Sequence, residues 1–90
     1  MSRSLRVQLK NARPDLVHEF RNFGEDVYRE LQDDYSVSIE EIDASISEFW
    51  LRAIPKREVR TVAARVRKVA EIYLNLVISV DEVKEESSDG

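Results

Sequence analysis

Few residues of this sequence are of the types that carry out catalysis. It contains no cysteine and a single histidine, His18, so it offers neither a thiolate nucleophile nor a cysteine-based metal site. His18 could act as a general base or a metal ligand beside Asp15 or Glu19, but one histidine without a second strong ligand makes a poor metal site. The only glycines, Gly24 and Gly90, are too far apart for a phosphate-binding loop. The sequence therefore predicts no catalytic residue, no metal site, no cofactor and no enzymatic activity.

The strongest chemical signal is the sorting of charge along the chain. Residues 52–68 hold seven Lys or Arg and one acid, whereas residues 15–48 hold eleven acids and two bases. On a helix, the basic side chains would lie away from a stripe of valines, where they could contact phosphate groups. The candidate nucleic-acid contacts are Lys56, Arg57, Arg60, Arg67 and Lys68. The net charge of −4 argues against indiscriminate binding to nucleic acids, and a charged helix face is more often simply solvated.

Trp50, the only tryptophan, indicates a second kind of surface. If residues 49–54 form a strand, Trp50 lies on the opposite face from Phe49. With apolar side chains of neighbouring strands it would form a patch rimmed by charge, as in the core of a protein interface. The predicted interface consists of Arg6, Gln8, Ile42, Trp50, Arg52 and Val77. The simpler alternative is that Trp50 packs alone over the aliphatic stems of Arg6 and Arg52.

These surfaces depend on elements that the hydrophobic pattern predicts. Residues 5–10 alternate apolar and polar side chains, which is the period of a strand with one buried face. Apolar residues at steps of three and four predict one helix from Pro14 to about Tyr35 and another from about residue 55 to 74. The β-rich run 76–80 predicts a last strand.

Residues 36–54 admit two interpretations. As a helix, the segment would begin with a capping box at 38–41 and repeat its apolar residues at helical spacing. As two strands, it is rich in β-branched and aromatic residues, has a short turn around residues 43–47 and is closed by Pro55. Composition favours the two strands, although the turn lacks the Asn-Gly pair typical of a hairpin.

The order strand, helix, strand, strand, helix, strand is that of a ferredoxin-like βαββαβ two-layer sandwich of the α+β class, with two helices over one face of an antiparallel sheet. Its inner face would carry Leu5, Val7, Leu9, Val37, Ile39, Phe49, Leu51, Ala53, Leu76, Ile78 and Val80. The helical interpretation of residues 38–54 leads instead to a three-helix domain with an N-terminal strand. In both cases residues 1–83 form a single domain, and residues 84–90 form a disordered acidic tail.

These observations predict a small non-catalytic binding or adaptor module that acts through protein–protein contacts. Its partner would be another protein or a second copy of the chain, as a homodimer through the open face of the sheet. The alternative is a nucleic-acid-binding protein that uses the basic second helix. The lack of cysteine favours a reducing compartment. No stretch approaches the roughly 18 apolar residues of a membrane span, so we expect a cytoplasmic location and no membrane partner.

Overall fold

The computed structural model describes residues 2–35, 38–41 and 47–84. In these residues the strands are β1 (Ser2–Leu9), β2 (Ser38–Glu41), β3 (Glu48–Pro55) and β4 (Ile78–Lys84). The helices are α1 (Val17–Gln32) and α2 (Val59–Ala70). Each helix is preceded by one 3-10 turn, Pro14–Leu16 before α1 and Lys56–Glu58 before α2.

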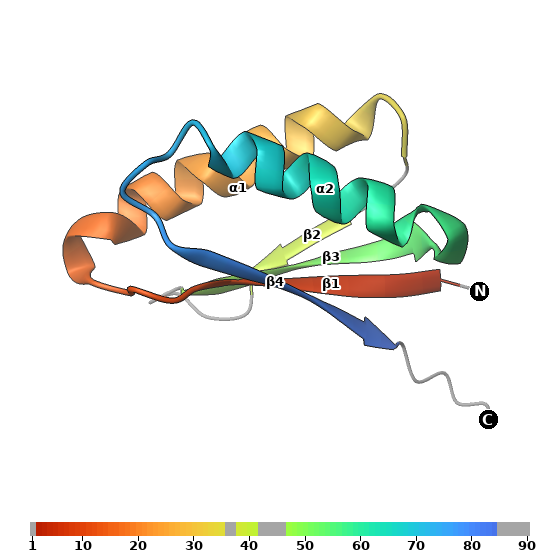
Figure 1. The fold of residues 1–90 in the computed structure, drawn as a ribbon, viewed down its shortest axis with the longest axis horizontal. Helices are drawn as coiled ribbons and strands as arrows, with labels where there is room; N and C mark the ends of the chain where they lie inside the picture. The colour runs from red at the N-terminus through yellow and green to blue at the C-terminus, as the bar shows by residue number, and fades with distance from the viewer. Residues whose placement is uncertain (1, 36–37, 42–46, 85–90) are drawn as a thin grey trace.

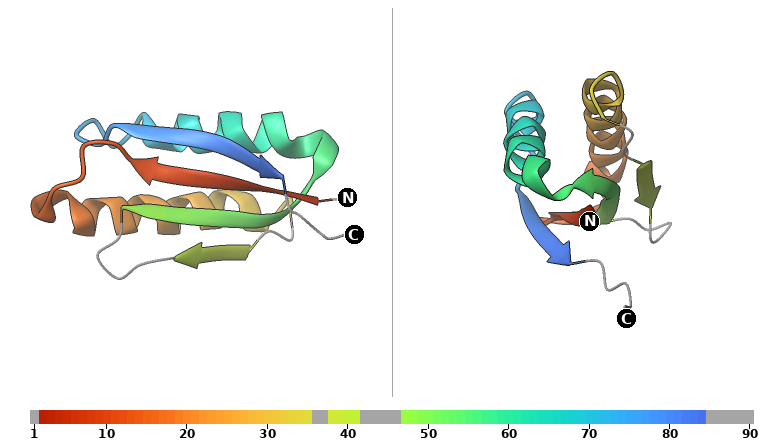
Figure 2. Two further views of the ribbon diagram at one scale, coloured as in Figure 1. Left: turned by 90° about the horizontal axis from the view of Figure 1, so that it is seen from below. Right: turned by 90° about the vertical axis from the view of Figure 1, so that its right-hand side faces the viewer.

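The strands form one antiparallel sheet in the order β2-β3-β1-β4. β1, the first strand in the chain, pairs with β3 on one side and with β4 on the other. Both helices lie over one face of this sheet, and none of the described helices covers the opposite face (Figures 1 and 2). The body of the sheet is the antiparallel set β3-β1-β4, to which the four residues of β2 add a short edge. The predicted α+β class is confirmed.

The helical interpretation of residues 38–54 is wrong, and the three-helix alternative falls with it. Residues 38–41 and 48–55 are strands that pair with each other, with Glu41 opposite Phe49. The reason is the alternation in β3, where Phe49 and Leu51 are buried and Trp50 and Arg52 are half-buried, which is the period of two residues that a strand produces. The predicted turn lies largely in residues 42–46, outside the described residues.

The helices and the last strand begin or end at residues that differ from those predicted by the spacing of the apolar residues. α1 stops at Gln32 rather than at about Tyr35, and α2 is confined to Val59–Ala70 because Pro55 still belongs to β3. β4 starts two residues later than predicted and continues to Lys84, which pairs with Arg3. Lys84 therefore belongs to the sheet and not to the predicted tail. Residues 85–90 lie outside the described residues.

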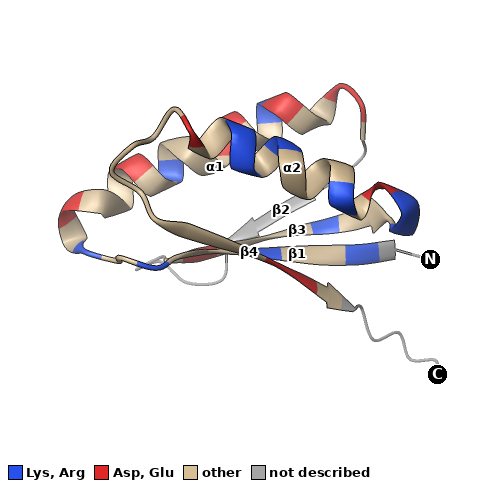
Figure 3. Cartoon of the chain, in the orientation of Figure 1, with Lys and Arg blue, Asp and Glu red and all other residues tan. Residues whose placement is uncertain are grey.

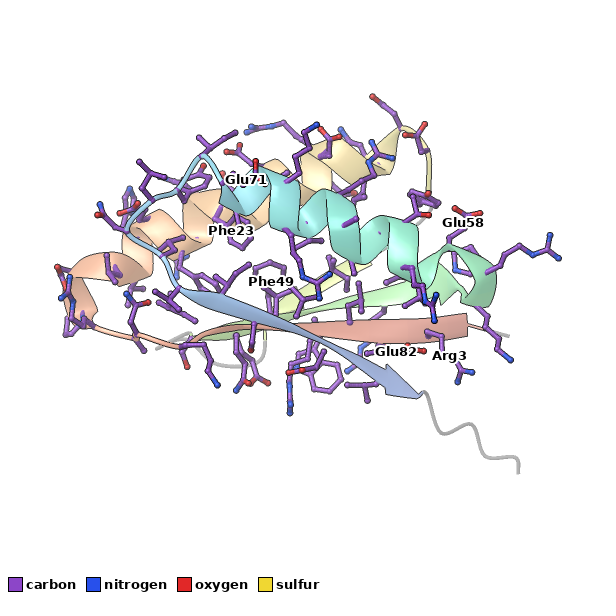
Figure 4. All side chains as sticks on the ribbon, viewed as in Figure 1. Arg3, Phe23, Phe49, Glu58, Glu71 and Glu82 are labelled. Carbon is purple, nitrogen blue, oxygen red and sulfur yellow. The ribbon has the colours of Figure 1, made fainter. Side chains whose placement is uncertain are left out.

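Three phenylalanines form the centre of the core between the helices and the sheet. Phe20 and Phe23 of α1 and Phe49 of β3 are buried, with ring centroids 5.4 to 6.0 Å apart. Figure 4 shows Phe23 and Phe49 in the layer between α1 and the sheet. Each such aromatic pair contributes about 0.5–1.5 kcal/mol beyond its buried area. The surrounding buried side chains include Leu5, Val7, Leu9, Val27, Leu31, Leu51, Ile54, Val62 and Val66.

A β-bulge in β3 changes which of its residues face the core. Arg3 pairs with Ile54 but Leu5 pairs with Leu51, so β3 has one extra residue at this point. Ala53 adopts a φ of 64°, a left-handed conformation that costs a residue other than glycine about 1–2 kcal/mol. As a result Ala53 is exposed and Ile54 is fully buried. The predicted inner position of Ala53 is wrong because strict alternation ends at the bulge.

Replacing Ala53 with glycine should stabilise the protein, because glycine adopts a positive φ without steric cost. The relief of about 1–2 kcal/mol exceeds the roughly 0.5–1 kcal/mol of chain entropy that glycine loses on folding. We therefore expect the free energy of unfolding, measured by urea denaturation, to rise by about 0.5–1 kcal/mol.

The matched control is Ala64→Gly, at an exposed position within α2, where glycine should lower the free energy of unfolding by about 1 kcal/mol. A decrease at both positions would contradict the left-handed conformation of Ala53.

Candidate binding surfaces

The structure gathers four of the six predicted interface residues on the open face of the sheet. Trp50 lies opposite Arg6 in the pairing of β3 with β1. Gln8 and Arg52 each lie two residues further along these strands, so they share the face of Arg6 and Trp50. All four side chains are half-buried. The left view of Figure 2 looks onto this face, with the helices behind the sheet.

Glu48, which is not among the predicted interface residues, contacts two of them on this face. Its carboxylate accepts a 2.8 Å hydrogen bond from the indole N–H of Trp50 and a 3.3 Å hydrogen bond from the side-chain amide of Gln8. The guanidinium carbon of Arg52 lies 4.8 Å from the centroid of the Trp50 ring, a cation–π contact. The contact is made by the charged guanidinium group of Arg52, whereas the simpler alternative for Trp50 placed the aliphatic stem of Arg52 under the ring. The spacing of two residues between Glu48 and Trp50 on one strand is the signal that predicts their contact.

Asp81 of β4 completes the surface by its contact with Arg6 at 3.4 Å. We use the name Trp50 surface for Arg6, Gln8, Glu48, Trp50, Arg52 and Asp81.

Of the other two predicted interface residues, Val77 lies beyond Gln8 at the end of this face and away from Trp50, and Ile42 lies outside the described residues. Val77 precedes β4, and its carbonyl accepts a 2.7 Å hydrogen bond from the backbone N–H of Lys10. Lys10 lies four residues beyond Arg6, which corresponds to about 13 Å along the strand direction. The surface around Trp50 is therefore more polar than the sequence analysis predicted.

The five predicted nucleic-acid contacts are all exposed, and among the described residues none of them forms an ion pair. They lie on the 3-10 turn before α2 and on α2 itself, and Figure 3 shows the basic residues along this helix. The residues are Lys56, Arg57, Arg60, Arg67 and Lys68.

Arg65, a further base of α2, joins the two helices by ion pairs. Its guanidinium contacts Glu30, in the last turn of α1, at 2.9 Å and Asp34, two residues after α1, at 2.7 Å. The hydrogen bond with Asp34, followed by the one with Glu30, raises the pKa of Arg65 above its ordinary value. Nearby, the Tyr35 hydroxyl donates a 2.9 Å hydrogen bond to Glu58, which raises the pKa of Tyr35. Part of the separation of acidic and basic segments along the chain therefore serves to hold the two helices together.

The segment 71–77 between α2 and β4 exposes apolar side chains that the sequence analysis did not assign to a surface. Ile72 is 74% exposed and Leu74 is 88% exposed. Tyr73, between them, points to the core, where its ring meets Phe23 edge-on at 5.6 Å and its hydroxyl donates a hydrogen bond to Asp26. The sequence could have indicated these exposed residues. Residues 69–80 contain more apolar side chains than one buried face of a helix or strand can accommodate.

The side chain of Asn11 holds the same segment at a second point. Its amide nitrogen donates to the carbonyl of Asn75, and its oxygen accepts from the backbone N–H of Val77, both at 3.0 Å. Leu74 is therefore exposed on a stretch of chain that is anchored on both sides.

His18 is exposed on α1, and no three His, Asp or Glu side chains in the described ranges gather as a group that could hold a metal ion. None of the described helices is long and apolar enough to cross a membrane.

Comparison of the chain with models of protein families, with curated proteins and with solved structures finds no match. The fold and the surfaces identify the chain as a small α+β domain with one open face of its sheet and no more than that. The function must therefore be argued from the surfaces of this chain.

The anchor made by Tyr73 predicts a change of stability in alkaline solution. The hydrogen bond with Asp26, together with burial, raises the pKa of Tyr73 from 10.0 to about 12. Because the folded-state pKa is the higher one, the stability from this contact is fully present below pH 10 and is lost as the pH rises through about 12. In Tyr73→Phe we expect the free energy of unfolding, measured by urea denaturation, to fall less as the pH rises above 10. A titration of tyrosinate absorbance should also lack the tyrosine that ionises at the highest pH in the wild type.

Tyr28→Phe, which changes an exposed ring on α1, is the control and should keep both features. An identical alkaline loss in wild type, Tyr73→Phe and Tyr28→Phe would show that the Tyr73 contact does not stabilise the fold.

Proposed function

We propose that this protein is a small, non-catalytic cytoplasmic binding module that pairs with a second copy of itself through the Trp50 surface. The observation that carries the proposal is the arrangement of this surface on the sheet face that none of the described helices covers, with Trp50 held between Glu48 and Arg52. Tryptophan and arginine are the residues most enriched among those that dominate binding energy at protein interfaces.

The charges of the Trp50 surface favour a second copy over a nucleic acid. Arg6 and Arg52 contribute two positive charges, and Glu48 and Asp81 contribute two negative charges, so these six residues have no excess of positive charge. Such a surface does not attract a phosphate backbone, whose binding requires excess positive charge. Two copies related by a two-fold axis can place the arginines of one against the carboxylates of the other. The surface is therefore complementary to itself.

Size and composition also support this proposal. A chain of 90 residues buries only about 60–65% of its unfolded surface, so covering the open face would add stability that the single domain lacks. The proposed cytoplasmic location rests on the lack of cysteine, because a chain without disulfides does not need an oxidising compartment.

We further propose that the complete domain is a ferredoxin-like sandwich. The order of the elements and the strand order β2-β3-β1-β4 support this finer assignment. It depends on β2, of which the described residues are only Ser38–Glu41.

The self-association proposal is tested by Trp50→Ala. Loss of a central interface tryptophan costs about 2 kcal/mol or more, so we expect the dissociation constant of the dimer to rise about thirtyfold or more. Light scattering after size exclusion, over a range of protein concentrations, measures this constant. The emission of Trp50 in the wild type should shift to the blue as the dimer forms.

The control is Leu74→Ser, which removes the most exposed large apolar side chain among the described residues, far from β3 in the chain. It should leave the dimer unchanged. A wild type that stays monomeric, or a Trp50→Ala variant that associates as before, would refute the proposal, and loss of the dimer in Leu74→Ser alone would assign the interface to segment 71–77.

Nucleic-acid binding by α2 is the second candidate function, supported by the five exposed cations without an ion pair among the described residues. If it is correct, a mixed single-stranded oligonucleotide binds with an affinity that falls steeply with salt. Anisotropy of a labelled oligonucleotide should then show weaker binding for Arg57→Glu/Lys68→Glu and for Arg60→Glu/Arg67→Glu alike. Binding that is equal in both variants and wild type would exclude this candidate.

A further inference from the structure

A groove of about 350 Å³ lies between α2 and β4, on the helix side of the sheet. Leu5, Val59 and Val80 contribute its apolar wall, and Glu82 lies at its β4 side. Arg60 and Arg67 of α2 line it as exposed side chains. The groove is thus apolar inside and basic along α2, and it lies on the other side of the sheet from the Trp50 surface.

Beside this groove, β4 offers an unpaired backbone edge. β4 is the outermost strand next to β1, with which it pairs from Ile78 to Lys84, and within the described ranges no strand pairs with its other side. The right view of Figure 2 shows α2 above this edge without covering it. Its seven residues match the usual length of a strand. Such an edge is a template for the addition of another extended segment.

The charges around the groove favour an acidic segment as the one that adds to this edge. Glu82 contacts Arg3 at 3.3 Å, and both residues lie at the same end of the sheet in Figure 4. The negative charge of Glu82 is therefore compensated. Arg60 and Arg67 are separated by two helical turns, about 10 Å along α2, and form no ion pair among the described residues. Both guanidinium groups are available to an acidic partner.

We propose that the groove binds an extended acidic peptide segment of another protein, which pairs with the free edge of β4 and directs alternate Asp or Glu side chains toward Arg60 and Arg67. Side chains on one face of a strand recur about every 6.6 Å, so acids at every second position supply a carboxylate within reach of each arginine. The backbone contacts supply affinity and the two arginines supply specificity. This site is independent of the proposed self-association.

The probe is a fluorescein-labelled peptide of alternating valine and glutamate, and its anisotropy measures binding. We expect Arg60→Glu/Arg67→Glu to weaken binding about tenfold or more, since charge reversal at a pairing site turns attraction into repulsion. The matched control, Arg57→Glu/Lys68→Glu, makes the same change of net charge at exposed positions that do not line the groove. It should change the affinity by less than about threefold, because these side chains do not line the groove and exposed charges that make no direct contact with a ligand act through water and are weakened by salt. Circular dichroism confirms that both variants are folded.

Two further probes separate strand addition from attraction by charge alone. A peptide with proline in place of the valines keeps the acids but favours a polyproline-II conformation, whose backbone does not form the ladder hydrogen bonds of a sheet, so we expect it to bind at least about tenfold more weakly. Equal binding of the proline peptide, or equal weakening in both double variants, would overturn the proposal. Tighter binding of a mixed single-stranded oligonucleotide than of the acidic peptide would also overturn it and would assign the arginines to nucleic acids.

Discussion

The packing of Phe20 and Phe23 against Phe49 is the interaction on which the remaining structure depends. These three rings join α1 to β3, and through Phe23 they also receive Tyr73 from the segment after α2. Because side chains alternate along a strand, burying Phe49 forces Trp50 to the opposite face. A shift of one residue in β3 would exchange these two aromatics and would destroy the core and the Trp50 surface together.

The charges of the two helices divide into a structural set and a free set. Arg65 is committed to Glu30 and Asp34 and fixes how α2 lies beside α1. Arg60 and Arg67 lie on the other flank of α2, facing β4. A single basic helix thus serves both purposes, because residues three or four apart share a flank and residues such as 65 and 67 do not.

The sequence predicts those parts of the structure that depend on local spacing. Alternation predicted the buried Leu5, Val7 and Leu9 of β1, and the Trp50 face followed from the same rule. The bulge at Ala53 escaped prediction because no glycine marks its positive φ. The distance of Val77 from Trp50 escaped it for another reason. That distance is set by the register between strands far apart in the chain, and no local pattern encodes this register.

The central position of β1 has a consequence for how the chain folds during its synthesis. β1 is made first, yet it pairs with strands made much later, with Leu9 opposite Ile78 and Arg3 opposite Lys84. Contacts so distant in sequence slow folding, because large loops must close before they form. The sheet is therefore completed only after residue 84 has left the ribosome. Until then β1 has an open edge beside its apolar face, and both features favour aggregation of incompletely folded chains.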